Sequence, residues 1–243
     1  MTDLHYEEPM LAAIYDFDNE WSIDGEFYLS LAGLTPCTIL DLGCGTGLLS
    51  DALATLGHEV TGVDPAAAML DIARQRPNGN RITWVQSTAQ AFRSSHRFDL
   101  IVMTGNTFQV LLDDEAIRNT FTTMRCHLAA NGRIAFETRN PAINWPVRWN
   151  RNKKFRMGET TIRQSRRVRD LDGNRIRFET HYAFPDRQFM SSSELLFLSK
   201  PEIEQRLSQS GLAAEAVYGD WDARAFDEAV SDTMIFIVKP KLV

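Results

Sequence analysis

The chain has 243 residues, of which 44% are hydrophobic and 24% are charged, and its formal net charge is −6 at pH 7. These values are ordinary for a globular protein, and the length suits one domain with or without an insertion. No apolar run approaches the roughly 18 residues that a membrane-spanning helix needs. The acidic balance argues against nucleic acid as the main partner.

Cysteine usage and the start of the chain bear on location and metal binding. Cys37, Cys44 and Cys126 are widely spaced, which argues against a disulfide framework and fits a reducing compartment. None of them is combined with histidine at a zinc-like spacing, so we expect no metal site. The stretch from Met1 to Pro9 is acidic and polar, which is not typical of a signal peptide. We therefore expect a cytoplasmic protein.

Residues 1–35 are expected to be helical and loop-like ahead of the first strand. Two groups of apolar side chains recur there at helical spacing. They are Met10, Leu11, Ile14 and Phe17, followed by Phe27, Tyr28, Leu31 and Leu34. For Tyr15 and Tyr28, packing onto the core competes with a place in a binding site.

A glycine-rich turn follows the first predicted strand, which covers residues 38–42. Gly43, Gly45 and Gly47 allow backbone to approach a ligand closely, and the free N–H groups of the next helix face the same spot. The spacing G-x-G-x-G differs from the dinucleotide fingerprint G-x-G-x-x-G. Asp41 ends the strand, and its carboxylate would repel a pyrophosphate but attract a cationic ligand.

The unit D-L-G-C-G-T-G at residues 41–47 resembles the first motif of class I S-adenosylmethionine-dependent methyltransferases. That cofactor carries an ammonium, a sulfonium and a ribose, and no phosphate. The resemblance covers residues 36–139 strongly and 193–243 in architecture. It implies an α/β, doubly wound fold whose seven-stranded, mostly parallel sheet has the order 3-2-1-4-5-7-6, with the last strand antiparallel. It also implies that residues 1–35 form a lid over cofactor and substrate.

A second predicted strand, residues 59–64, ends in Asp64. This acid lies 17 positions after Gly47, near the distance at which such folds place a carboxylate on a ribose diol. Asp64 also suits the N-cap of a helix that starts at Pro65, and the two roles are compatible. The helix is expected over residues 66–76 and presents Met69 on its apolar face.

The next two predicted strands, residues 81–86 and 98–103, lead to the same edge of the sheet. After the first come Thr88 and Ala89, where the resembled family commonly has an acid near the adenine. The missing acid leaves the adenine contact to backbone or to another side chain. The second strand ends at residues 104–109, which face the crevice beyond the carboxyl ends of the strands. The resemblance places the methyl group and the substrate there.

Taken together, the predicted cofactor-binding residues are Asp41, Gly43, Cys44, Gly45, Gly47, Asp64, Pro65, Met69, Thr88, Ala89, Thr104, Asn106 and Phe108. Asp113 is expected to cap the next helix, with Asn131-Gly132 as its end and residues 133–138 as the fifth strand.

Residues 140–192 interrupt the parallel pattern, and we expect an inserted antiparallel β segment over the cleft. Residues 163–169 and 175–184 predict a hairpin around Asp172-Gly173. Between residues 148 and 177 there are eleven basic and three acidic side chains, an excess of eight positive charges. A solvated sheet face explains this excess, and a site for an anionic substrate or for RNA is the alternative.

The chain end is predicted to complete the sheet. Ser199 and Glu202 have the spacing of a capping box, and Gly211 is expected to end the helix that they open. Residues 214–219 and 233–239 are expected to be the last two strands. Trp221 lies in the loop between them, where it is either a lid residue or a packing residue.

The predicted function is methyl transfer from S-adenosylmethionine to a small-molecule acceptor. In-line displacement on an activated carbon depends chiefly on positioning and on excluding water, so we expect no catalytic residue. The candidate bases are Tyr15, Glu137, His181 and Tyr182, each with a structural role as the alternative. The candidate substrate contacts are Tyr15, Tyr28, Asn140, His181, Tyr182 and Trp221.

Three other functions compete with this one: an RNA methyltransferase, a non-catalytic cofactor-binding or regulatory protein, and an NAD-dependent oxidoreductase. The first depends on the basic insert alone, and the glycine spacing and Asp41 argue against the last. We expect no membrane partner, and a homodimer is left open.

Overall fold

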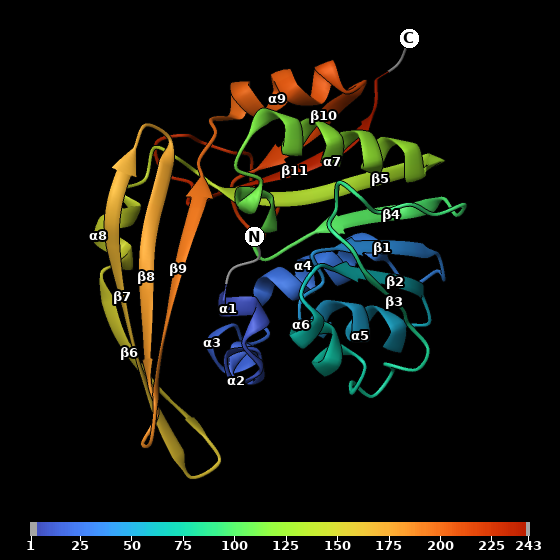
Figure 1. Cartoon of the computed structure of the whole chain (residues 1–243). Coiled ribbons are helices and arrows are strands. Elements are labelled where there is room, and N and C mark those ends of the chain that lie inside the picture. The colour runs from blue at the N-terminus through green and yellow to red at the C-terminus, as the bar shows by residue number, and fades with distance from the viewer. Residues whose placement is uncertain (1–3, 242–243) are drawn as a thin grey trace.

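The computed structural model describes residues 4–241 and contains two β-sheets (Figure 1). The larger sheet has the strand order β3-β2-β1-β4-β5-β11-β10. Strands β1 to β5 are paired in parallel, and β11 is antiparallel to both of its neighbours. This confirms the predicted seven-stranded order. The strands are β1 (Thr38–Leu42), β2 (Glu59–Asp64), β3 (Thr83–Gln86), β4 (Phe98–Met103), β5 (Leu128–Arg139), β10 (Leu212–Tyr218) and β11 (Thr233–Pro240).

Helices cover both faces of this sheet, as expected when parallel strands are joined by helical crossovers. Helices α4 (Ile23–Ala32) and α5 (Leu48–Thr55) pack against one face, and α7 (Asp114–His127) and α9 (Lys200–Gln209) against the other (Figure 1). The predicted caps are present: Asp113 accepts a bond from the Ala116 N–H at 2.7 Å, and Ser199 and Glu202 form the capping box. Within residues 4–241, none of the helices combines the length and the apolar character needed to cross a bilayer.

The predicted role of Gly132 as a helix stop is wrong. Helix α7 already ends at His127, and β5 begins at Leu128. A Cβ on Gly132 would lie 2.8 Å from the Phe98 carbonyl oxygen of β4. The glycine therefore allows two backbones to approach closely inside the sheet, a role that local spacing does not distinguish from a helix end.

The second sheet has four antiparallel strands in the order β6-β7-β8-β9 and stands beside the core (Figure 1). The predicted hairpin is present, with Asp172 paired to Arg175 at the turn. Two further strands were not predicted, because the first is rich in basic and polar residues and the last in serine, which have low strand propensity. The predicted division at residue 192 falls within β9. The strands are β6 (Arg151–Met157), β7 (Thr160–Asp172), β8 (Arg175–Ala183) and β9 (Gln188–Leu196), preceded by helix α8 (Trp145–Trp149).

Three short helices lie between the two sheets, namely α1 (Leu4–Glu7), α2 (Pro9–Ala13) and α3 (Tyr15–Asp18) (Figure 1). On one side, Leu11 and Ile14 are buried with aromatic residues of the second sheet. On the other side, Ala12 is buried against α6 (Ala67–Ala73) of the core. The segment predicted as a lid thus packs against both parts of the molecule; its residues 1–3 lie outside the described part.

Replacing Leu11 should measure how strongly this segment is held. The side chain is fully buried among Ile162, Tyr182 and Phe184 of the second sheet. We expect Leu11→Ala to lower the free energy of unfolding by about 2–5 kcal/mol, measured by denaturant titration, because it leaves a cavity. Phe17→Ala, at a side chain that is 37% exposed, serves as the control and should cost less. Equal losses in both variants would contradict a buried attachment.

Candidate cofactor and acceptor site

The glycine turn connects β1 to α5, and its three glycines have φ values of 77°, 53° and 74°. A Cβ on Gly43 would collide with Thr107, and one on Gly47 would lie 2.6 Å from the Trp84 ring. Nothing lies within 4 Å of a Cβ built on Gly45. The outer two glycines are therefore required by packing, whereas Gly45 presents its backbone to open space where a ligand can approach.

Asp41 is buried at the end of β1, directly before this turn. Its Oδ2 accepts a hydrogen bond from the Ser50 hydroxyl at 2.7 Å, and its Oδ1 has no partner within the described part of the chain. Burial raises the pKa of Asp41 to about 7. A buried carboxylate oxygen without a donor is costly, so a cationic or hydrogen-bond-donating ligand would be stabilised here.

Asp64 ends β2 and holds the turn from the other side. Its Oδ2 accepts the Gly45 N–H at 2.9 Å, and its Oδ1 accepts the Ala66 N–H at 2.9 Å. The prediction that Asp64 is the N-cap of a helix starting at Pro65 is wrong, because α6 starts at Ala67 and its N-cap is Ala66. Each carboxylate oxygen can accept more than one bond, so Asp64 can hold the turn and still accept two hydroxyls. Burial raises the pKa of this carboxyl group.

Two of the other predicted cofactor residues are Cys44 of the glycine turn and Met69 of α6. Burial raises the pKa of the Cys44 thiol. Met69 is buried beneath α2. Other positions are used locally: Pro65 accepts a bond from Gln86, Thr88 from the Ala91 N–H, and Thr104 from Thr107. Ala89 packs against the core, and Phe108 is buried there between Phe121 and Phe136 rather than among the polar groups of the crevice.

Helix α3 lies against the glycine turn through Asp16. This carboxylate accepts the Thr46 hydroxyl at 2.6 Å and forms an ion pair with Arg76. Two residues later, Asp18 accepts bonds from Lys153, at 3.0 Å, and Gln164 of the second sheet. The four-residue helix therefore joins the cofactor loop to the insert, a contact that sequence reasoning missed because neither aspartate belongs to a motif.

Tyr15 opens this helix. Burial and the negative charges around it, including Asp64, hold the pKa of its phenol far above the usual value, so the hydroxyl is neutral and keeps its proton. The structure thus brings Tyr15 to the cofactor side of the lid. Its predicted contact with substrate stays a prediction.

Glu137 joins three segments that are distant in sequence. Its carboxylate accepts a hydrogen bond from the Tyr28 hydroxyl and another, at 2.6 Å, from the Asn106 N–H in the turn after β4. Burial raises the pKa of Glu137 to about 7. Asn106 has φ 58° in the left-handed region, so this bond stabilises an otherwise unfavourable turn. The Trp221 ring is tilted by 59° against the Tyr28 ring, with 6.1 Å between the ring centres, so these two predicted residues lie together.

Three other predicted substrate residues lie apart. Tyr182 is buried on the inner face of the second sheet, where its hydroxyl accepts a bond from Gln164 at 3.1 Å. His181 is its neighbour in the strand and therefore points to the outer face, 3.5 Å from Glu179. Asn140 is fully buried, and its amide bonds to the Glu228 and Ser231 carbonyl groups. These contacts give Asn140 a structural role and add no support for one in substrate binding.

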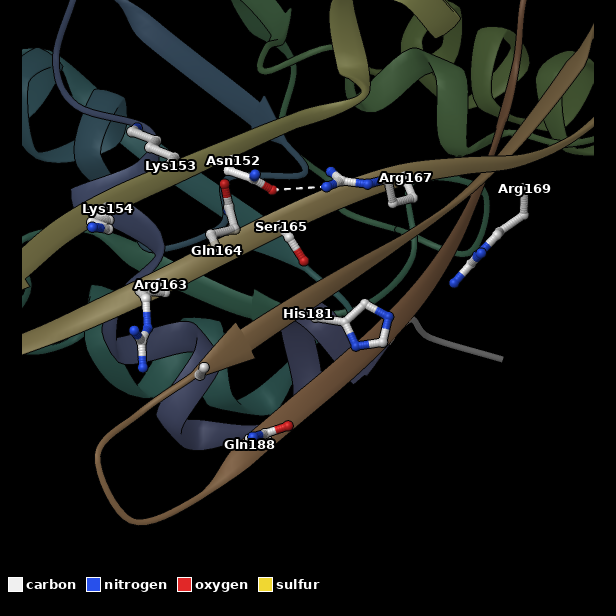
Figure 2. A pocket seen from close by; sticks show the side chains of 11 residues that line it. Asn152, Lys153, Lys154, Arg163, Gln164, Ser165, Arg167, Arg169, His181 and Gln188 are labelled. Atoms are coloured by element: carbon white, nitrogen blue, oxygen red, sulfur yellow. Dashed lines mark hydrogen bonds between the residues drawn. The ribbon is translucent and has the colours of Figure 1, made fainter.

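Several basic side chains of the insert lie on the outer face of the second sheet. Figure 2 shows a pocket there, lined by Arg163, Arg167, Arg169 and His181, with Arg167 donating to Asn152 at 2.9 Å. Because side chains alternate along a strand, these residues point away from the lid and the glycine turn. This outer face is separated from the crevice by the sheet itself.

Comparison with known proteins bears on this geometry. Residues 39–132 match the family model of a methyltransferase domain. The matched stretch holds the glycine turn, Asp64 and helix α7. Over 68 residues, the chain is 43% identical to a ubiquinone biosynthesis O-methyltransferase of Shewanella halifaxensis; the match covers 27% of this chain and only 29% of that relative.

The two sheets and the helices around them resemble solved structures over nearly the whole chain. A S-adenosylmethionine-dependent methyltransferase from Clostridium acetobutylicum superposes with a TM-score of 0.80 at 17% identity, covering 97% of this chain and 99% of its own. CalS10, an amino pentose methyltransferase from Micromonospora echinaspora, superposes with a TM-score of 0.72 at 21% identity, covering 94% and 97%. The lid and insert are therefore part of a shared fold.

The raised pKa of Glu137 makes stability depend on pH. Between about pH 4.5 and 7, the folded chain keeps a proton on this group that the unfolded chain has lost, so the free energy of unfolding falls as pH rises through that window. Glu137→Gln removes this contribution. We expect its stability, measured by denaturant titration at several pH values, to fall less than that of the wild type across the window.

Glu115→Gln, at an exposed position in the first turn of α7, is the control and should follow the wild-type pH profile. Parallel profiles for Glu137→Gln and the wild type would contradict the assignment.

Proposed function

We propose that this chain is a S-adenosylmethionine-dependent methyltransferase that acts on a small-molecule acceptor. One observation carries the proposal: the unpartnered Oδ1 of Asp41 is buried beside a glycine turn that is open at Gly45 and held by Asp64. The match to a methyltransferase domain and the fold shared with an amino pentose methyltransferase, solved with S-adenosylmethionine bound, support it.

The residues present fit this cofactor. Asp41 suits its ammonium group, Asp64 suits the two ribose hydroxyls, and the open backbone at Gly45 allows close approach. When bound, the cofactor supplies a methyl group already activated on a sulfonium. The turn has the spacing G-x-G-x-G and lacks the third glycine of the dinucleotide fingerprint G-x-G-x-x-G, so the NAD-dependent alternative has no support from the sequence.

The chain itself contributes alignment and exclusion of water. Helix α3 closes over the turn through Asp16, and the Glu137–Asn106 bond fixes the loop after β4 where the acceptor would lie. Holding reactants in line at contact distance is the main contribution that such a displacement requires. We assign no catalytic residue.

The proposal also covers the acceptor class, the location and the assembly of the chain. A small molecule suits a crevice covered by a short lid, whereas RNA would need basic side chains facing the crevice, and Arg163, Arg167 and Arg169 line a pocket on the opposite face. Cytoplasmic location and homodimer formation remain part of the proposal, to be checked by fractionation and light scattering.

Two measurements test the function. Calorimetry should detect binding of S-adenosylhomocysteine below millimolar concentration, and isotopically labelled S-adenosylmethionine should transfer label to a small molecule in a metabolite extract. Absence of cofactor binding would refute the proposal. Binding without transfer to any acceptor would favour the non-catalytic alternative, and a response to NADH alone would favour an oxidoreductase.

Asp64→Ala should weaken binding of S-adenosylhomocysteine by roughly 1–3 kcal/mol, the scale of hydrogen bonds to a charged group. Asp71→Ala changes an exposed carboxylate on α6 whose ion pair with Arg74 lies on the surface, and it should leave the affinity unchanged. Calorimetry on both variants makes the comparison. An unchanged affinity in Asp64→Ala would show that the ribose does not bind to Asp64.

Gly45→Ala should abolish or strongly weaken cofactor binding at a small cost in stability. The added methyl group enters the open space beside the turn, and the positive φ of 53° costs about 1 kcal/mol. Gly158→Ala is the matched control, because Gly158 has a similar φ of 58° with nothing within 4 Å in the described part of the chain but lies in the turn between β6 and β7. Both variants should lose similar stability in thermal unfolding, and only Gly45→Ala should lose affinity. Full affinity in Gly45→Ala would show that the ligand does not approach this backbone.

A further inference from the structure

Two arginines from different parts of the fold meet on one aromatic surface. Arg139 ends β5, and its guanidinium carbon lies 5.1 Å from the Trp149 ring centre. Arg166 lies on β7 of the second sheet, 5.0 Å from the Phe178 ring centre. The two rings are themselves in contact, at 5.1 Å between centres. The aromatic pair thus brings together one cation from the core and one from the insert.

Neither guanidinium has a carboxylate within 4 Å in the part of the chain that the structure describes. Arg139 donates to the Gln109 amide oxygen at 2.8 Å, and Arg166 donates to the Thr180 hydroxyl at 3.3 Å, both neutral acceptors. The acids in their surroundings are engaged elsewhere, Glu137 with Tyr28 and Asn106, and Asp18 with Lys153 and Gln164. Several donor groups of both side chains therefore remain available for a ligand.

Other arginines of the second sheet behave differently. Arg169 pairs with Glu179, and Arg175 and Arg177 pair with Glu194, at 2.7 to 3.0 Å. Arg139 and Arg166 are also less exposed to solvent than Arg169 and Arg177. Burial and the positive charge of Arg166 lower the pKa of Arg139 to about 10, and burial lowers the pKa of Arg166. Two desolvated like charges without a counterion destabilise each other, and an anion between them would relieve that cost.

The location connects this pair to the proposed reaction. Arg139 follows Glu137 by two residues at the carboxyl edge of the sheet, and Glu137 bonds the loop after β4. Gln109, which holds Arg139, lies in the short helix η1 (Thr107–Val110) of that same loop. The phenols of Tyr6 and Tyr15 from the lid lie in the electrostatic surroundings of Arg139.

We propose that Arg139 and Arg166 together bind an anionic group of the methyl acceptor, a carboxylate or a phosphate. A guanidinium presents a planar fork of donors that matches the paired oxygens of both groups. The inference rests on the proposed function only in calling the ligand the acceptor; the anion site itself does not depend on it. The proposed site implies that the acceptor is a small molecule whose negatively charged group binds between the core and the insert.

The test uses inorganic phosphate and propionate as probes of the two anion chemistries. Each is titrated into the full chain at constant ionic strength set with sodium chloride, and binding is followed by the shift in unfolding temperature. We expect one of the two probes to stabilise the wild type beyond the chloride control. Arg139→Gln and Arg166→Gln should each weaken that binding at least tenfold.

Arg167→Gln is the matched control, because Arg167 is the next residue in the strand and points to the outer pocket (Figure 2). It should keep wild-type anion binding. Failure of both probes to bind, or equal losses in Arg166→Gln and Arg167→Gln, would overturn the inference. Arg166→Lys keeps the charge and should recover part of the affinity, which separates anion binding from loss of folding.

Titration of S-adenosylhomocysteine into the same variants separates the two proposals. The affinity for this cofactor product should be unchanged in Arg139→Gln and Arg166→Gln. Cofactor binding without binding of either anion would refute the anion site and leave the methyltransferase proposal standing. Anion binding without cofactor binding would confirm the site and refute the proposed function.

Discussion

The arrangement of the molecule depends on two aspartates in the short helix α3. Asp16 is bonded to Thr46 and Arg76 beside the glycine turn, and Asp18 is bonded to Lys153 and Gln164 of the second sheet. A helix of four residues has little stability of its own, so its conformation depends on these contacts and on the apolar packing of the neighbouring α2. Together they place the lid between core and insert.

Local patterns predicted the core but not the contacts between its parts. The glycine turn, Asp41 and the caps at Asp113 and Ser199 follow from spacing within about twenty residues, whereas the order of the sheet is implied by the resemblance to class I methyltransferases. The Tyr28–Glu137 bond joins residues 109 positions apart, and no single segment encodes it. The same holds for Asp18 with Gln164, since both are ordinary polar residues until the fold brings them together.

In the basic insert, the alternation of side chains along a strand puts neighbouring basic residues on opposite faces of the sheet, which the amino-acid composition alone does not reveal. Arg166 and Arg167 are adjacent, yet one contacts Phe178 inside and the other Asn152 outside. A net count of charges over residues 148–177 could not make this distinction. The register could, because β7 pairs Arg166 with Thr180 and Arg167 with Glu179. Predicting that register requires the partner strand, which periodicity within one segment does not identify.

The attachment of α3 on both sides has a thermodynamic consequence. A motion that separates Asp16 from Thr46 also disturbs Asp18, so the cofactor side and the insert side are exposed together. The ligand that first orders this helix bears the entropic cost of closing it, and a second ligand then binds to a helix already in place. We therefore expect the cofactor and the anion proposed above to bind cooperatively, even though no bond would link the two ligands directly.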